Sequence, residues 1–193
     1  MPRTNYIFID FENVQEIDLD RIAGKPVKVT YVLGERHKNL PVALVKLLLK
    51  YAGQVALVET GRNGKNALDL VLAQYIGATK QADPHGYYHV ISKDKDFDAL
   101  ISHLQSNDTL AARHTAFCEI QVLMNLDERM KFIMTHFQSK QVTRAKKRGK
   151  LESQIQALFG RTLSAVELDE TINGLVAQKK IAIGASAEVT YKM

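Results

Sequence analysis

The chain has 193 residues, of which 46% are hydrophobic and 24% charged, so we expect a packed core rather than global disorder. This length fits one domain with an appendage, or one medium and one small domain. The single cysteine, Cys118, excludes an internal disulfide, and no Cys/His cluster has zinc-ligand spacing. The first residues do not resemble a signal peptide and no apolar run approaches a membrane span, which predicts a cytoplasmic protein without a membrane partner.

The net charge of +5 is concentrated in one short segment. Residues 144–150 read RAKKRGK and carry five positive charges, whereas residues 1–143 sum to +1 and residues 151–193 to −1. Such a cluster favours phosphate backbones through counterion release, although a solvated spacer would have the same composition. We predict a basic linker over residues 142–150, with nucleic-acid contacts from Arg144, Lys146, Lys147, Arg148 and Lys150.

Strand-like and helix-like segments alternate along the first 110 residues. Short apolar or β-branched runs predict strands at residues 6–9, 27–33, 55–58 and 87–91. Apolar residues at three- and four-residue steps predict helices at residues 39–51, 66–75 and 97–104. This alternation is typical of right-handed βαβ units, so we expect an α/β fold with a doubly wound, mainly parallel sheet.

The pattern is less regular after residue 108. Residues 109–115 predict a fifth strand, residues 117–124 fit either a strand or a helix, and residues 126–137 predict a helix. We expect this helix to close the first domain, which we place at residues 1–141.

Residues 151–193 predict a small α+β module. A short helix over residues 151–159 is followed by a capping box, in which Ser164 and Glu167 begin a second helix. Residues 180–183 and 188–191 flank a turn and predict a hairpin. Two helices and a hairpin resemble an incomplete winged helix, which would dock on nucleic acid. Two alternative roles of the module stay equally open: it could form a homodimer, or it could pack onto the first domain.

Acidic residues come directly after several of the predicted strands. In an open parallel sheet, ligands bind beyond the carboxyl ends of the strands, so these side chains are expected to converge. Clustered carboxylates repel one another, and bound Mg²⁺ or Mn²⁺ relieves that repulsion and activates water for attack on phosphorus. The residues concerned are Asp10, Glu12 and Asn13 after the first strand, Asp69 after the third, and Asp94, Asp96 and Asp98 after the fourth.

Each acid also has a local interpretation. Asn66 and Asp69 fit a capping box, and Asp94 or Asp96 fits the N-cap of the next helix. Asp98 would interact favourably with the dipole of the same helix. Capping one helix requires fewer than three aspartates. The expected topology also brings the acids to one edge of the sheet, so we favour a shared site.

Three segments, read together, resemble the motifs of PIN/NYN-like nucleases, whose fold is a Rossmann-like (Rossmannoid) α/β sheet. They are FIDFENV at residues 8–14, GKNALD at residues 64–69 and ISKDKDF at residues 91–97, and the likeness covers roughly residues 5–115. It implies a metal-dependent endoribonuclease acting on single-stranded or flexible RNA. It also implies that Mg²⁺ or Mn²⁺ is held by Asp10, Asp69, Asp94 and Asp96, with Asn13 and Ser92 in support.

Further basic residues near these motifs are candidate phosphate contacts. Arg62 and Lys65 lie in a glycine-containing loop that fails the P-loop pattern, because Glu59 and Asn66 occupy two of its required positions. Lys93 and Lys95 flank Asp94 within the third motif. A catalytically silent RNA-binding module stays open as an alternative function. A phosphohydrolase using Asp10 is disfavoured, because Glu12 stands where the common phosphatase pattern has a second Asp.

Overall fold

The computed structural model describes residues 3–34, 37, 39–61, 64, 66–139 and 141–192. The chain forms two compact units, Met1–Ile120 and Gln121–Met193. Within the described ranges, none of the helices combines the length and the apolar character needed to cross a membrane.

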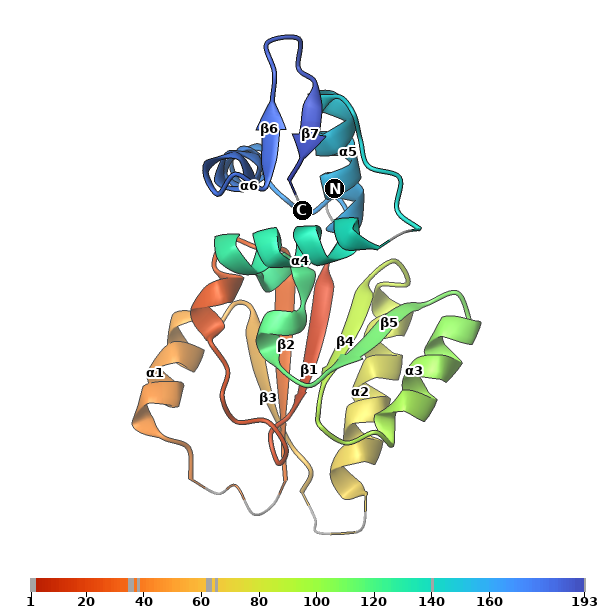
Figure 1. Ribbon diagram of the computed structural model, residues 1–193. Coiled ribbons are helices and arrows are strands. Elements are labelled where there is room, and N and C mark those ends of the chain that lie inside the picture. The colour runs from red at the N-terminus through yellow and green to blue at the C-terminus, as the bar shows by residue number, and fades with distance from the viewer. Residues whose placement is uncertain are drawn as a thin grey trace. The chain divides into compact units, whose positions relative to one another are not determined.

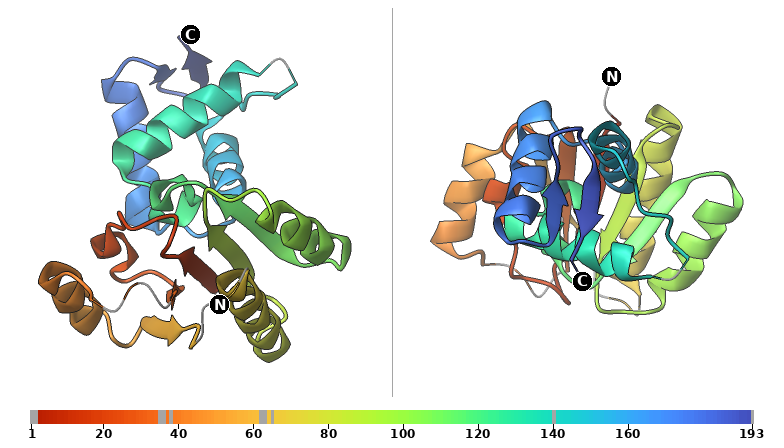
Figure 2. Two further views of the ribbon diagram at one scale, coloured as in Figure 1. Left: turned by 90° about the horizontal axis from the view of Figure 1, so that it is seen from below. Right: turned by 45° about the horizontal axis from the view of Figure 1, so that its top comes forward.

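The first unit is built on a five-stranded sheet (Figure 1). All neighbouring strands are parallel and the order is β3-β2-β1-β4-β5, so the expected doubly wound α/β sheet is confirmed. The carboxyl ends of the strands lie at the lower edge of the sheet in Figure 1, and the left view of Figure 2 looks onto that edge. The strands are β1 (Asn5–Asp10), β2 (Val27–Leu33), β3 (Val55–Glu59), β4 (Tyr87–Ile91) and β5 (Leu110–His114).

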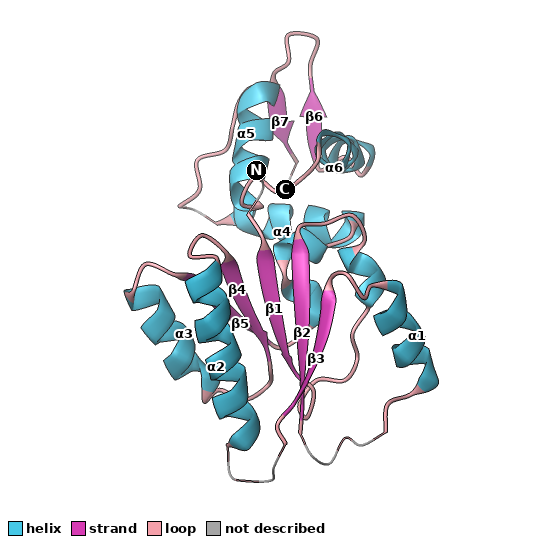
Figure 3. Cartoon of the chain, turned by 180° about the vertical axis from the view of Figure 1, so that it is seen from behind, coloured by secondary structure: helices cyan, strands magenta, loops and turns pink. Residues whose placement is uncertain are grey.

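Three α-helices connect these strands: α1 (Val42–Lys50), α2 (Ala67–Ala82) and α3 (Phe97–Ser106). Helices α2 and α3 cover one face of the sheet, and α1 lies beside the β3 edge (Figure 3). Leu72 and Ile76 of α2 pack with Ile101 of α3 on Phe8 and Val90 of the strands. These apolar contacts fix the start of each helix beside a strand end, where the acidic residues stand.

Short 3₁₀ helices complete the first unit and begin the second. They are η1 (Leu19–Ile22), η2 (Phe117–Glu119) and η3 (Gln121–Leu123). Residues 117–124, which fitted a strand or a helix, therefore form two single 3₁₀ turns.

A polar chain crosses the buried part of three strands in the first unit. His89 is fully buried, its Nε2 lies 3.0 Å from Asn5 Oδ1, and its Nδ1 lies 3.1 Å from His114 Nε2. Since Asn5 Oδ1 only accepts, His89 donates through Nε2 and accepts from His114 through Nδ1. Burial, together with the neighbouring His114, lowers the pKa of His89 well below its ordinary value.

The second unit contains three helices followed by a hairpin: α4 (Leu126–Gln138), α5 (Arg148–Leu158), α6 (Ala165–Ala177), β6 (Ile181–Ile183) and β7 (Val189–Tyr191). Its core joins Ile133 and Phe137 of α4 to Ile155 of α5, Ile172 of α6 and Val189 of β7. Helix α4 therefore belongs to this unit, and the division lies before α4 rather than at residue 141. The predicted hairpin is confirmed, and α4 adds a third helix, while the winged-helix likeness stays a prediction.

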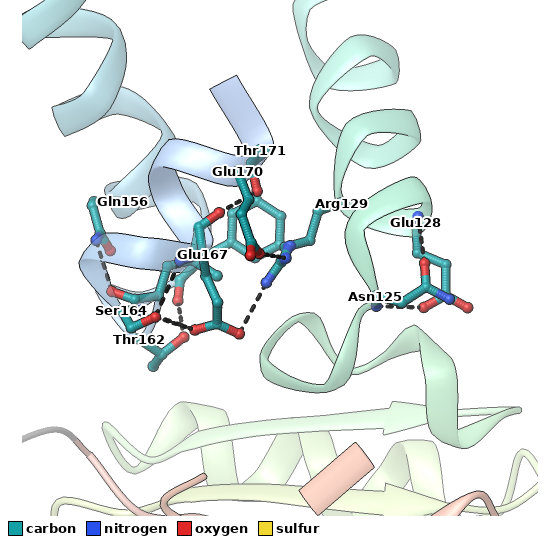
Figure 4. Close-up of polar contacts among 11 residues, drawn as sticks. Asn125, Glu128, Arg129, Gln156, Thr162, Ser164, Glu167, Glu170 and Thr171 are labelled. Atoms are coloured by element: carbon teal, nitrogen blue, oxygen red, sulfur yellow. Dashed lines mark hydrogen bonds and ion pairs between the residues drawn. The ribbon is translucent and has the colours of Figure 1, made fainter. Parts of the chain in front are cut away.

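Polar contacts fix α4 against α6 within the second unit (Figure 4). Arg129 of α4 is buried and donates to Glu167 at 2.9 Å, with Glu170 at 3.9 Å. Glu167 also completes the predicted capping box with Ser164, which is confirmed. An ion pair this buried has few alternative partners, so it fixes one arrangement of the two helices.

The basic segment at residues 142–150 is part of this unit and not a linker. The Val189 amide donates to the Lys146 carbonyl at 3.0 Å, and the Arg148 amide donates to the Ala187 carbonyl at 2.9 Å. Lys147 forms an antiparallel bridge with Glu188, and α5 begins at Arg148. The segment is thus joined by one isolated bridge and two backbone hydrogen bonds to residues at the start of β7, far ahead in the chain.

Candidate active site

The candidate site lies where the sheet changes its direction of winding. Strand β1 pairs with β2 on one side and with β4 on the other, so the connections leaving β1 and β4 diverge at their carboxyl ends. Such a switch point leaves a crevice at the carboxyl edge, where ligands of open α/β sheets bind. Asp10 is the last residue of β1, and Ser92 directly follows β4.

Asp10 is buried, at 1% exposure, and held on two sides. Its Oδ2 accepts from Asn13 Nδ2 at 2.6 Å and from Ser92 Oγ at 2.6 Å, and its Oδ1 accepts from the Asn13 amide at 3.3 Å. A buried carboxylate needs such donors to stay charged. Asn13 and Ser92 therefore hold the Asp10 carboxylate, while their role in support of a metal site stays a prediction.

The Ser92 hydroxyl also accepts a hydrogen bond within the third motif, where a second hydrogen bond follows. The Asp94 amide donates to Ser92 Oγ at 3.0 Å, and the Asp96 amide donates to Asp94 Oδ1 at 2.9 Å. Asp96 stands at the N-cap position of α3 but its side chain makes no capping hydrogen bond. The local interpretation as a helix cap is therefore wrong for Asp96, whereas Asp94 does accept a cap-like hydrogen bond from the amide two residues ahead.

The capping box predicted for α2 is absent as well. Asn66 precedes the helix with a left-handed backbone, φ 62°, and its side chain makes no capping bond. The pKa of Asp69 is raised instead, chiefly by burial. The negative charges of Asp10 and Asp94, and then those of Asp96 and Glu12, raise it further. Asp10, Glu12, Asp69 and Asp94 line one cavity, whereas Asp96 is not among its lining residues.

A small cavity of about 140 Å³ opens among these residues. Polar groups make up most of its lining, so it suits a hydrated ion or a phosphate oxygen rather than an apolar ligand. The lining residues that bear on its chemistry are Asp10, Glu12, Asn13, Asn66, Asp69 and Asp94.

Glu12 reaches the cavity because of a glycine on the neighbouring strand connection. A Cβ placed on Gly34 would lie 1.8 Å from Glu12 Oε1 and 2.7 Å from its Cδ. Any other residue at position 34 would displace this carboxylate. Gly34 and Thr60, which also line the cavity, were not predicted, because only the packing reveals them.

Asp98, a candidate supporting residue, contacts the site indirectly through an arginine. Its carboxylate pairs with Arg113 of β5 at 2.6 Å, and that hydrogen bond lowers its pKa. Arg113 also donates to the Ser92 carbonyl at 3.0 Å. The pair thus steadies the loop that carries Ser92, and Asp98 is not among the residues lining the cavity. Arg113 was missed because an arginine in a strand carries no sign of its partners.

The predicted phosphate contacts of this unit divide in two groups. Lys93 and Lys95 are exposed beside the third motif. Arg62 and Lys65 lie outside the residues that the structure describes. The five basic residues at 144–150 belong to the second unit.

The ligand chemistry of the cavity suits a hard divalent ion. Carboxylate oxygens are the ligands that Mg²⁺ and Mn²⁺ prefer, and Mg²⁺ keeps several waters while taking only one or two carboxylates directly. In the described ranges, no three His, Cys, Asp or Glu side chains already form a compact metal-binding group.

Comparison with known proteins identifies a family. A family model of the PIN domain matches residues 4–114, which span β1 to β5 and all the acids of the candidate site. Neither the curated proteins nor the solved structures contain a match. The second unit lies wholly outside the matched residues.

Proposed function

Because the chain belongs to the PIN-domain family, whose members are generally nucleases, we propose that it is a metal-dependent endoribonuclease. Its substrate would be single-stranded or flexible RNA, and the reaction hydrolysis of a phosphodiester bond. The observation that carries this proposal is the convergence of Asp10, Asp69 and Asp94 on one polar cavity at the sheet switch point.

Four aspartates would hold the ion, either Mg²⁺ or Mn²⁺, one or two of them directly and the others through its bound waters: Asp10, Asp69, Asp94 and Asp96. When bound, such an ion lowers the pKa of a coordinated water and stabilises charge that develops on phosphate oxygens. The raised pKa of Asp69 supports this assignment, because its carboxylate is partly buried and also lies near like charges that a cation would neutralise.

The remaining residues would orient this set. Asn13 and Ser92 fix both oxygens of Asp10, so its carboxylate keeps one rotamer. Ser92 also fixes the Asp94 amide, and Arg113 fixes the Ser92 carbonyl. Exposed Lys93 and Lys95 are placed to contact substrate phosphates beside the acids.

The direct test is incubation of end-labelled single-stranded RNA with the full chain, with Mg²⁺ or Mn²⁺ and with EDTA. Internal cleavage that requires the ion supports the proposal. Binding without cleavage in every metal condition would instead identify the silent RNA-binding module. Release of phosphate from a monoester without internal cleavage would identify a phosphohydrolase.

A further inference from the structure

Two adjoining clefts run along α5 in the second unit. The first has a volume of about 470 Å³, and Thr143, Lys146, Lys150 and Ser153 are among its lining residues. The second, of about 370 Å³, shares Ser153 and is also lined by Arg161. Together they form what we call the α5 groove, along a helix of 11 residues, about 16 Å long.

The wall of the α5 groove is a fixed piece of backbone. Gln154 donates from Nε2 to the Thr143 carbonyl at 2.9 Å and accepts from the Ala145 amide at 3.2 Å. The Tyr191 hydroxyl donates to the Ala145 carbonyl at 2.8 Å. Lys146 follows directly and is tied to β7 by its own carbonyl. Its side chain therefore starts from a defined point, unlike a lysine on a flexible linker.

Two cations of the basic segment are already engaged within the unit. Arg148 pairs with Glu152 at 2.8 Å and with Asp169 at 3.0 Å. Lys147 lies 3.6 Å from Glu188 and donates to a backbone carbonyl of the hairpin turn. Glu152 lines the groove, and because Arg148 neutralises its carboxylate, it repels a phosphate less strongly.

Of the other cations of the groove, one is engaged within the unit and three are exposed. Arg144 uses Nε to donate to the Phe137 carbonyl at 2.8 Å, and its guanidinium lies over the Tyr191 ring. Lys146, Lys150 and Arg161 are exposed, and their side chains have no hydrogen-bond or ionic partner among the residues that the structure describes. The unpaired positive charge of the segment is thus focused on the groove.

We infer that the α5 groove is a binding site for the sugar–phosphate backbone of single-stranded RNA. Lys146, Lys150 and Arg161 supply the charge, and the hydroxyl of Thr143 donates to phosphate oxygens, whereas the Ser153 hydroxyl already donates to the Gly149 carbonyl. The choice of RNA rests on the proposed function, whereas the recognition of a phosphate chain rests on the groove itself. The site differs from the acidic cavity, which lies in the other unit.

The test compares two double variants of the full chain by fluorescence anisotropy. The probe is a fluorescein-labelled 20-nucleotide oligouridylate in EDTA, measured over a range of KCl concentrations. In Lys146→Gln/Lys150→Gln, loss of two contacts lowers the slope of log affinity against log salt by about 1.4, at about 0.7 per contact with a single strand. Thermal unfolding of each variant confirms that these exposed substitutions leave the fold intact.

The matched control is Lys180→Gln/Lys192→Gln, which removes the same charge from exposed positions of the same unit outside the groove. Its slope should stay close to that of the wild type. An equal drop in both variants would overturn the inference, because binding would then depend on overall charge. An unchanged slope in Lys146→Gln/Lys150→Gln would overturn it as well. Since EDTA is present throughout, absence of nuclease activity is a separate result with a separate readout.

Discussion

The two units differ in how they distribute charge. The first, residues 1–120, carries 14 basic and 14 acidic residues, whereas the second, residues 121–193, carries 12 basic and seven acidic residues. The whole net charge of +5 thus belongs to the second unit. A neutral total in the first unit nevertheless conceals a strongly acidic cavity, so the local grouping of charges says more about chemistry than the sum does.

The units also differ in what surrounds their buried charges. Asp10 in the first unit is held by the neutral donors Asn13 and Ser92, so its negative charge is not cancelled. Arg129 in the second unit is held by the opposite charge of Glu167. The first arrangement keeps a charge available for a ligand, whereas the second uses the charge to join two helices.

The largest expected effect is on catalysis by the first unit. Asp94→Asn removes a proposed ligand charge with little change in volume, so RNA cleavage in Mg²⁺ should fall by more than about 100-fold, beyond what loss of an outer-shell partner causes. Anisotropy in EDTA should show nearly unchanged RNA binding. Asp108→Asn, an exposed substitution at a left-handed turn that suits Asn, is the control. Activity of Asp94→Asn within a fewfold of wild type would refute the metal-site assignment.

The next effect concerns the boundary between the units. A fragment spanning Gln121–Met193 should unfold cooperatively on its own, because α4 supplies Ile133 and Phe137 to its core. A fragment spanning residues 151–193 should not fold, since it lacks these side chains and the Lys147 backbone bridge to Glu188 beside β7. Circular dichroism during thermal unfolding measures both. A cooperative transition in the shorter fragment would restore the boundary expected from the sequence.

The sequence was sufficient to predict the sheet and the acids at its edge. Each strand is a compact apolar run, and parallel topology brings the residues after each strand to one edge, so Asp10, Asp69 and Asp94 could be grouped without a structure. The prediction of domain boundaries failed where a segment packs or pairs with residues far away in the sequence. The apolar stripe of α4 shows that it packs, but not on which elements. The basic segment pairs with β7, about 40 residues ahead, and reads locally as a spacer.

Backbone conformation and side-chain pairing also limit what can be predicted from the sequence. Asn66 fits an N-cap by type, but its left-handed backbone turns its side chain away from that role. The spacing of Asp98 fits the acidic cluster, but its carboxylate forms an ion pair with Arg113 of β5. Neither outcome is encoded in the spacing of nearby residues, because both depend on how the loops are held by the folded sheet.

A smaller effect tests the shape of the acidic cavity. Gly34→Ala should displace Glu12, whose flexible side chain can move, so cleavage should fall several-fold with little change in thermal stability. Combining it with Glu12→Gln should cause no further loss, because both changes remove the same group. Gly53→Ala is the matched control, since nothing lies within 4 Å of the added Cβ. Additive losses in the double variant would show that position 34 acts by another route.

The smallest effect is a pH dependence of stability in the first unit. Burial lowers the pKa of both His89 and His114, so the unfolded state binds more protons than the folded state just below the ordinary histidine pKa of about 6.5. The unfolding free energy should therefore fall as pH decreases from about 6.5 to about 5, and stay level above that window. Each histidine contributes at most about 1.4 kcal/mol per pH unit.

Replacing one member of the pair isolates this contribution. His89→Gln should reduce the slope of unfolding free energy against pH by up to one proton, leaving the share due to His114. The measurement is urea unfolding in EDTA at pH 5, 6 and 7, with exposed His103→Gln as the control. The acids whose pKa is lowered, such as Asp98, titrate below this window and do not imitate the effect. An identical slope in His89→Gln and in wild type would show that the buried pair is already protonated in the folded state.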